Sequence, residues 1–160
     1  MLQKNWPAII LTISCLSITT ALVAQYMFNL LPCKMCYYQR YVYYTIILLT
    51  LIFLIFKIKK SLIYLIIIEI LLLIGLTLSL WHVGIENNLI EGTSGCSNIL
   101  LESENPSNNI NVLKEYILNN PIATCDQTNW SFLGISFAIY NAILQVVLLI
   151  INSILILKLK

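Results

Sequence analysis

The sequence predicts an all-α membrane protein: a bundle of four transmembrane helices with one long external loop that carries a disulfide and a short interfacial helix. Of the 160 residues, 59% are hydrophobic and only 10% are charged. A spanning helix needs about 20 mostly apolar residues, and four such windows occur, at about 7–30, 37–56, 61–80 and 132–157. Their continuous Leu and Ile runs lack the polar alternation of barrel strands. Residues 1–160 are therefore expected to form a single integral-membrane domain.

The positive charges predict how the helices are oriented. Short cytoplasmic loops carry an excess of Lys and Arg. Lysines occur before the first window, between the second and third, and at the end of the chain, namely at Lys4, Lys57, Lys59, Lys60, Lys158 and Lys160. Both termini are thus expected in the cytoplasm and the loops at about 31–36 and 82–129 outside. The net charge of +2 is too small to suggest a nucleic-acid partner.

The first window is expected to span the membrane. Lys4, an apolar run and small residues around 21–24 also loosely fit a cleaved signal peptide. The stretch is nevertheless long enough to span, and cleavage would leave Cys33 close to a free, unanchored end. Cys15 lies roughly midway along this window, where a single thiol usually packs as a small apolar side chain.

A Cys-x-x-Cys motif at 33–36 joins the first and second windows, and the rest of the chain is organised around it. Neighbouring positive charge and a helix N-terminus favour a thiolate at such a motif. Pro32 is a suitable start for a helix, so both cysteines are expected in the first turn of the second span, with Arg40 one turn beyond Cys36. Zinc and haem sites share this spacing, but Tyr37 stands where haem attachment requires a histidine.

The third window contains Glu69, and a carboxylate within the membrane is by default a functional candidate. The sequence shows no partner for it, so a functional role and a place at a polar helix interface both stay open. Farther along, residues 81–86 leave the membrane on the outer side and bring His82 near the level of Cys33 and Cys36. A lone histidine has many structural uses, but this location makes His82 a candidate site residue.

The external segment 82–129 is too short and too polar to form a core of its own. Cys96 and Cys125 would staple it, with a stabilisation of about 3 to 4 kcal/mol if the bond is unstrained. Residues 110–118 have apolar side chains at helical spacing, which predicts the interfacial helix. Together with the motif at 33–36, these cysteines also suggest a four-thiolate zinc site, although only one pair is closely spaced.

Three segments of the chain resemble the DsbB family of bacterial inner-membrane, disulfide-generating quinone reductases. The first is similar to the family's first external loop, the second to the end of its third helix, and the third to the segment that leads into its fourth. They are Leu31-Pro32-Cys33-Lys34-Met35-Cys36-Tyr37-Tyr38-Gln39-Arg40, Trp81-His82-Val83-Gly84-Ile85-Glu86, and Ala123-Thr124-Cys125-Asp126 with Trp130-Ser131-Phe132-Leu133-Gly134. The likeness covers nearly the whole chain.

The resemblance implies a protein-dithiol:quinone oxidoreductase of the bacterial inner membrane. Cys33 and Cys36 would form one exchangeable disulfide, and Cys96 and Cys125 would form another. The partner would be a DsbA-like periplasmic thioredoxin-fold oxidase that attacks Cys96, after which Cys125 attacks Cys33 and releases Cys36 as the thiolate that faces the quinone. The four cysteines are the expected catalytic residues.

The resemblance also implies that Arg40 and His82 bind the cofactor, ubiquinone with menaquinone as the alternative, and that no metal takes part. Gln39 occupies a position where some relatives have an acid, so no proton-handling role is carried over to it. Glu69 is left unexplained. The rival hypothesis is a non-enzymatic membrane protein whose external loop is stapled by a disulfide or binds a metal.

Overall fold

The computed structural model describes residues 2–56, 61–91, 125 and 131–159 of the chain. These residues form four long helices and a small antiparallel hairpin. The elements are α1 (Leu2–Met27), α2 (Lys34–Ile55), α3 (Ser61–Glu86), β1 (Ser131–Phe132), β2 (Ile135–Ser136) and α5 (Phe137–Leu157). All four helices are long and apolar enough to cross a membrane. The predicted four-helix membrane bundle is therefore confirmed, whereas the interfacial helix expected at 110–118 lies outside the described residues.

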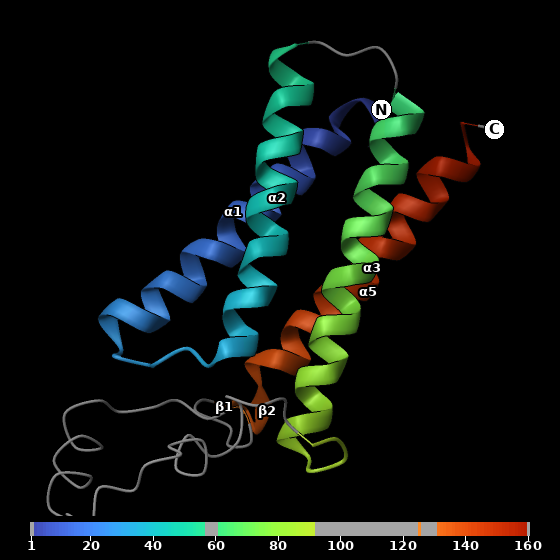
Figure 1. Cartoon of the computed structure of the whole chain (residues 1–160). Coiled ribbons are helices and arrows are strands. Elements are labelled where there is room, and N and C mark those ends of the chain that lie inside the picture. Colours follow the sequence, from blue (N-terminus) through green and yellow to red (C-terminus); the bar gives the residue numbers. More distant parts are fainter. Residues whose placement is uncertain (1, 57–60, 92–124, 126–130, 160) are drawn as a thin grey trace, which may run out of the picture.

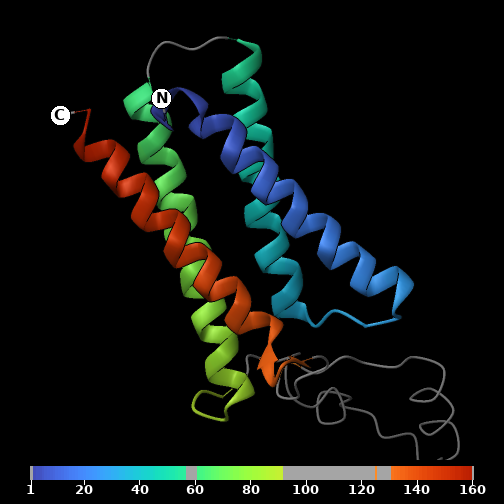
Figure 2. The ribbon, with the colours of Figure 1, turned by 180° about the vertical axis from the view of Figure 1, so that it is seen from behind.

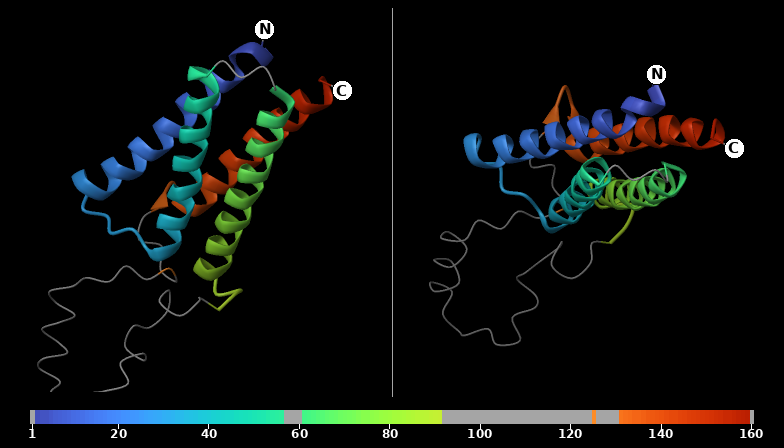
Figure 3. Two further views of the ribbon diagram at one scale, coloured as in Figure 1. Left: turned by 45° about the horizontal axis from the view of Figure 1, so that its top comes forward. Right: turned by 90° about the horizontal axis from the view of Figure 1, so that it is seen from above.

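The helices lie in two layers, with α1 and α5 in one and α2 and α3 in the other (Figure 3). Within and between these layers, α3 packs along α5, α1 along α2, and α2 along α3. The start of α1 and the end of α5 lie at the same end of the bundle (Figure 1). The hairpin and the start of α2 lie at the opposite end, as an even number of spans requires.

The apolar core fills the half of the bundle next to the two termini. Trp6 and Ile10 of α1 are almost completely buried there, and side chains of the other three helices pack against them. Those side chains are Val42, Ile46, Tyr64, Leu65, Ile68, Leu72, Leu148, Leu149 and Leu155. Both α1 and α5 lie on the same side of α2 and α3 (Figure 2), and toward the other end no comparable apolar cluster of the described residues lies between them.

A polar cluster inside this half gives Glu69 the partners that the sequence did not reveal. Asn152 donates to one Glu69 oxygen at 2.6 Å, and Ser153 donates to the other. Asn152 also donates to the Leu65 carbonyl at 2.9 Å and accepts from the Trp6 indole at 2.9 Å. The carboxyl group therefore sits at a polar helix interface, where it links α3 to α5 and, through Asn152, to α1.

The first helix ends at Met27, before the predicted boundary near residue 30, because Asn29 turns the chain. Asn29 has a φ of 52°, in the left-handed region, which asparagine tolerates better than most residues. The Leu30 amide then donates to the Ala24 carbonyl at 3.2 Å, which holds the chain against the last turn of α1. The chain consequently leaves α1 and runs along the end of the bundle opposite the termini, toward the motif at 33–36.

The fourth helix begins at Phe137 rather than near residue 132, which corrects the predicted span. Leu133 and Gly134, with φ values of 53° and 78°, form the two-residue turn between β1 and β2. Positive φ at both positions matches the twist that a tight hairpin needs. Ser136 then caps α5, because its hydroxyl accepts from the Ile139 amide at 3.4 Å.

Two other boundaries differ in ways that matter for the site. Cys33 is the N-cap residue of α2 rather than part of its first turn, while Cys36 does lie in that turn. The helix α3 continues to Glu86 instead of ending near residue 80. His82 and Glu86 are therefore four residues apart on one helical face, instead of lying in the loop predicted from residue 82.

Candidate active site

Three cysteines meet at the N-terminal end of α2. The Cys33 and Cys36 sulfurs are 3.1 Å apart, and since a disulfide bond measures about 2.05 Å, the structure describes the dithiol form of this pair. Cys125 is completely buried and packs with Cys33, Met35 and Ile85 in a small cluster. The predicted partner of Cys125, Cys96, lies outside the described residues.

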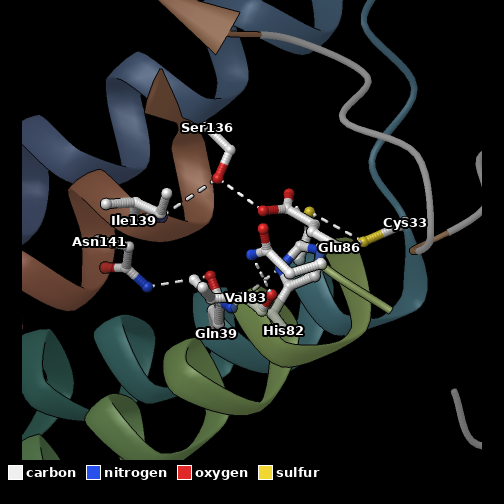
Figure 4. A network of polar contacts seen from close by, with 10 residues as sticks. Cys33, Gln39, His82, Val83, Glu86, Ser136, Ile139 and Asn141 are labelled. Carbon is white, nitrogen blue, oxygen red and sulfur yellow. Dashed lines mark hydrogen bonds and ion pairs between the residues drawn. The ribbon is translucent and has the colours of Figure 1, made fainter. Parts of the chain in front are cut away.

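The helix α3 adds a histidine and an acid to this cluster (Figure 4). The His82 Nε2 atom lies 3.4 Å from the Cys33 sulfur and 3.9 Å from a Glu86 oxygen. Ser136 donates to the other Glu86 oxygen at 2.6 Å, which ties the end of α3 to the start of α5. Because His82 is 5% exposed and Cys33 is 2% exposed, their contact is shielded from solvent.

The surroundings of Cys33 keep its thiol protonated. Hydrogen bonding with Cys125 lowers the pKa of the Cys33 thiol, but hydrogen bonding with Cys36 and burial raise it by more, so that this pKa rises from 9.0 to about 12. An anionic sulfur loses the hydrogen bonds of water when it is buried, which disfavours the charged form. Cys33 is therefore expected to stay a neutral thiol well above the pH at which an ordinary cysteine ionises.

A second row of polar side chains approaches His82 from the opposite side of the ring. Gln39 Nε2 lies 3.2 Å from His82 Nδ1, and Gln39 Oε1 accepts from Asn141 at 2.9 Å. Asn141 also donates to Ser79 at 2.8 Å and accepts from Tyr43 at 2.5 Å. Side chains from α2, α3 and α5 therefore hold the imidazole in place (Figure 4).

A cavity of about 440 Å³ runs from the cysteines into the bundle between α1, α2 and α5. This volume is in the range of small-molecule sites in proteins, about 300 to 1,000 Å³. Leu16 lines the cavity and is nevertheless 61% exposed, so the cavity opens sideways, toward the lipid. Its walls are mainly apolar. The polar and ionisable side chains of the cysteine cluster line one end of it: Cys33, Cys36, Gln39, Arg40, His82 and Glu86.

Arg40 lies in the wall of the same cavity and joins α2 to α1. Its guanidinium donates to the Gln25 side chain at 2.6 Å and to the Ala21 carbonyl at 3.2 Å. The guanidinium also lies 5.6 Å from the centre of the Tyr37 ring, within the range of a cation–π interaction. With these partners the charge is held at the polar end of the cavity.

The structure brings most of the predicted site residues together. Cys33, Cys36, Cys125 and His82 form one cluster, and Arg40 lines the adjoining cavity. Sequence reasoning did not identify the side chains that orient His82, namely Gln39, Ser79 and Asn141. A usable signal was present, because amide and hydroxyl side chains within apolar spans tend to make hydrogen bonds between helices.

The same cluster has a spacing that a metal ion would accept. One donor atom each from Cys33, His82 and Cys125 lies within 4.8 Å of the other two. Two thiolates and an imidazole are typical ligands of zinc. The spacing of these donor atoms is therefore compatible with metal binding as well as with thiol exchange.

Comparisons with known proteins agree with the arrangement of cysteines and spans. The family described as "Disulfide bond formation protein DsbB" matches residues 3–155. The chain is 32% identical over 142 residues to "Uncharacterized protein RP370" of Rickettsia prowazekii (strain Madrid E). The aligned region covers 89% of this chain and 81% of that relative. No solved structure matches the chain. Since the family match extends over almost all of the sequence, the chain belongs to the DsbB family.

Proposed function

We propose that this protein oxidises a DsbA-like periplasmic thiol oxidase by disulfide exchange and passes the electrons to a membrane quinone. Membership of the family implies disulfide formation and an oxidoreductase role. The identity of the thiol partner and that of the electron acceptor are what we propose in addition. The observation that carries the proposal is the position of the Cys33 sulfur, 3.1 Å from Cys36 and within 4.8 Å of Cys125. A sulfur so placed can exchange its bond from one cysteine to the other.

The exchange begins with Cys33–Cys36 and Cys96–Cys125 as disulfides. A thiolate of the partner attacks Cys96, and Cys125 leaves as a thiolate. The second partner thiolate then attacks the sulfur bonded to Cys96, so the partner becomes a disulfide and Cys96 a thiolate. Each step forms one S–S bond and breaks another, as thiol exchange requires. The partner has lost two electrons and two protons.

The electrons then move toward the cavity. Cys125 attacks Cys33, and Cys36 leaves as a thiolate at the polar end of the cavity. Cys96 next attacks Cys125 in the Cys33–Cys125 bond, which releases Cys33, and Cys33 closes the bond with Cys36 when the electron pair has passed to the acceptor. The protein returns to its starting state, and one partner dithiol and one quinone have become one disulfide and one quinol.

The residues that line the cavity fit a quinone. The apolar walls suit an isoprenoid-bearing ring, and the opening beside Leu16 gives access from the lipid. Cys36, Arg40 and His82 lie where the ring would be held. A bound quinone would supply the oxidising power by accepting two electrons and two protons; ubiquinone is the proposed acceptor and menaquinone the alternative.

We place the cysteine end of the bundle in the periplasm of a bacterium and both termini in the cytoplasm. The lysines in the sequence favour this orientation. The start of α1 and the end of α5 lie at the end of the bundle opposite the start of α2, where the cysteines are (Figure 1), so one side of the membrane would receive both termini and the other would receive the partner.

The test uses the full-length protein in detergent or lipid with a reduced thioredoxin-fold partner and a soluble quinone. Quinone reduction should be lost in Cys36→Ser, because Cys36 is the last sulfur in the relay. Cys15→Ser is the matched control, since Cys15 is exposed on α1 and is not among the cavity residues, and it should keep the original rate. Undiminished turnover of Cys36→Ser would reject this electron route.

The partner's point of attack can be mapped separately. A partner that lacks its resolving cysteine should remain attached as a mixed disulfide, and peptide mapping should place the bond at Cys96. A bond at Cys33 or Cys36 instead would contradict the order of the relay.

The second candidate function is a non-enzymatic, metal-binding protein, and the spacing of Cys33, His82 and Cys125 is the observation that favours it. Purified protein that carries one zinc per chain and has no exchangeable disulfide would support this alternative. Protein that is free of zinc and has exchangeable disulfides would exclude it.

A further inference from the structure

A backbone carbonyl fixes the direction of the hydrogen bonds that lead to His82. Ser79 donates its hydroxyl hydrogen to the Gly75 carbonyl at 2.8 Å. A carbonyl can only accept, so the Ser79 oxygen must accept the bond from Asn141 Nδ2, which is also 2.8 Å long. The Asn141 amide is therefore oriented with its nitrogen toward Ser79 and its oxygen toward the Tyr43 hydroxyl.

Asn141 passes this orientation on to Gln39. Its Nδ2 atom has two hydrogens, and the second is donated to Gln39 Oε1 at 2.9 Å. The Gln39 nitrogen consequently faces His82 Nδ1 at 3.2 Å. An amide nitrogen only donates, so Nδ1 must be the unprotonated ring nitrogen, and in a neutral imidazole the hydrogen is then on Nε2.

The protonated ring nitrogen is the one that faces the cysteines. His82 Nε2 lies 3.4 Å from the Cys33 sulfur. We propose that Gln39 is a positioning residue that holds neutral His82 as the Nε2–H tautomer, so that the ring donates a hydrogen bond to the Cys33 sulfur. Sequence reasoning assigned His82 to the quinone alone; this inference gives it a second contact, with the sulfur at the centre of the relay.

The consequence for catalysis rests on the proposed function. Cys33 carries negative charge after Cys96 has released it from Cys125 and before it closes the bond with Cys36 as the electron pair passes to the acceptor. A fixed N–H donor at the sulfur stabilises that charge, because hydrogen bonds to ionised acceptors are stronger than those between neutral groups. His82 then acts as a donor to the thiolate, and no proton needs to leave the ring.

The same tautomer argues against a metal at this cluster. A metal-bound histidine offers an unprotonated nitrogen to the ion and donates its other N–H group to an acceptor. At His82 the two nitrogens are reversed: the nitrogen that faces Cys33 carries the hydrogen, and the other faces an amide donor. The described geometry is therefore that of a thiol site.

The tautomer can be observed directly, because His82 is the single histidine in the chain. Protein labelled with ¹⁵N-histidine and reduced, in lipid nanodiscs at mildly alkaline pH, should show one protonated and one unprotonated ring nitrogen, with the proton on Nε2. In Gln39→Glu the carboxylate can only accept, so the proton should move to Nδ1.

A second variant tests the same chain of bonds from a distance. In Asn141→Asp the donor to Gln39 is lost, so the Gln39 amide should turn over and present its oxygen to His82, again moving the proton to Nδ1. Gln25→Glu is the matched control. The Gln25 oxygen accepts from Arg40, outside this row of side chains, and the tautomer should stay Nε2–H.

Each spectrum decides the proposal without a partner or a quinone, so its failure would be distinct from failure of the proposed function. An Nδ1–H ring or a doubly protonated ring in the unmodified protein would overturn it. So would an unchanged tautomer in both Gln39→Glu and Asn141→Asp.

Discussion

Cys33 is central to the candidate site, because it lies against both other cysteines of the cluster and against His82. Its sulfur touches Cys36 and His82, and Cys125 packs beside it. As the N-cap residue of α2 it has no side-chain capping hydrogen bond, so the sulfur is available to its neighbours. A substitution at Cys33 would therefore remove the sulfur that contacts both Cys36 and His82.

Alkylation of reduced protein should reveal the raised pKa of Cys33. Because this pKa lies near 12 rather than 9.0, the thiolate fraction should keep rising about tenfold per pH unit through the interval between these values. Modification by iodoacetamide, followed by mass spectrometry, should show no plateau for Cys33 by pH 10. A cysteine at the exposed position of Glu91, made by Glu91→Cys, should level off near its ordinary pKa.

The raised pKa of Cys33 should also make the stability of the reduced protein depend on pH. Between pH 9 and about pH 12 the folded protein keeps the Cys33 proton, while the unfolded chain loses it. The free energy of unfolding of the reduced protein should therefore fall as the pH rises through this interval. Levelling of Cys33 modification near pH 9 would contradict both expectations.

At this scale the sequence predicted which residues lie at the candidate site but not how they are oriented. Cys33, Cys36, Arg40 and His82 were recognisable, because thiols, a guanidinium and an imidazole are uncommon beside apolar spans. The role of Gln39 depends on Asn141, which is 102 residues away in the chain. Local sequence patterns contain no information on such a contact.

At the scale of the elements, two clusters of polar side chains connect the helices at different depths. One surrounds Glu69 near the termini, and the other surrounds His82 near the cysteines. Between helices in lipid, apolar side chains gain little from leaving a solvent as apolar as themselves, so close packing and hydrogen bonds hold the helices together. Asn152 and Asn141 thus fix how α5 lies against α3.

Replacement of Asn152 by leucine should lower the free energy of unfolding by about 2 kcal/mol. Hydrogen bonds between membrane helices average about 0.6 kcal/mol each, but a buried polar group left without a partner costs about 1 to 3 kcal/mol. Asn152→Leu removes a partner from Glu69, Trp6 and the Leu65 carbonyl together, so the second effect should dominate.

Reversible unfolding in mixed micelles can measure this difference. Ile150→Leu, at an exposed apolar position of the same helix, is the control and should change the free energy by less than about 0.5 kcal/mol. A loss in Asn152→Leu no larger than in the control would show that the Glu69 cluster does not stabilise the bundle.

The helices themselves were predictable, and their ends were less so. Four long apolar windows are sufficient to predict four spans. The end of α1 depends on the left-handed Asn29, and the start of α5 depends on the turn at Leu133 and Gly134. Apolar residues continue through these turns, and hydropathy alone therefore could not place the boundaries.

At the scale of the whole molecule, the bundle separates a packed half from a half that contains a cavity. The core lies near the termini, and the cavity and the cysteines lie at the other end. The sequence could predict the spans and the side favoured by the lysines. The opening between α1 and α5 follows from the crossing of the helices, so only the structure shows it.

Labelling should show that the two ends of the bundle face different compartments. In a variant without its native cysteines, a cysteine introduced by Glu91→Cys should react with a membrane-impermeant maleimide in intact bacterial spheroplasts. One introduced by Leu159→Cys should react only after the membrane is permeabilised. Both positions are exposed, so a difference would report the side of the membrane. The reverse pattern would contradict the proposed orientation.

Because the cavity opens laterally beside Leu16, the concentration of an apolar substrate that matters is its concentration in the membrane. A molecule that enters there arrives by diffusion in two dimensions, out of a phase that the proposed water-soluble partner would not enter. Its effective dose is its mole fraction in the bilayer or micelle, so dilution with extra lipid should weaken its apparent affinity even when its total amount in the vessel is constant.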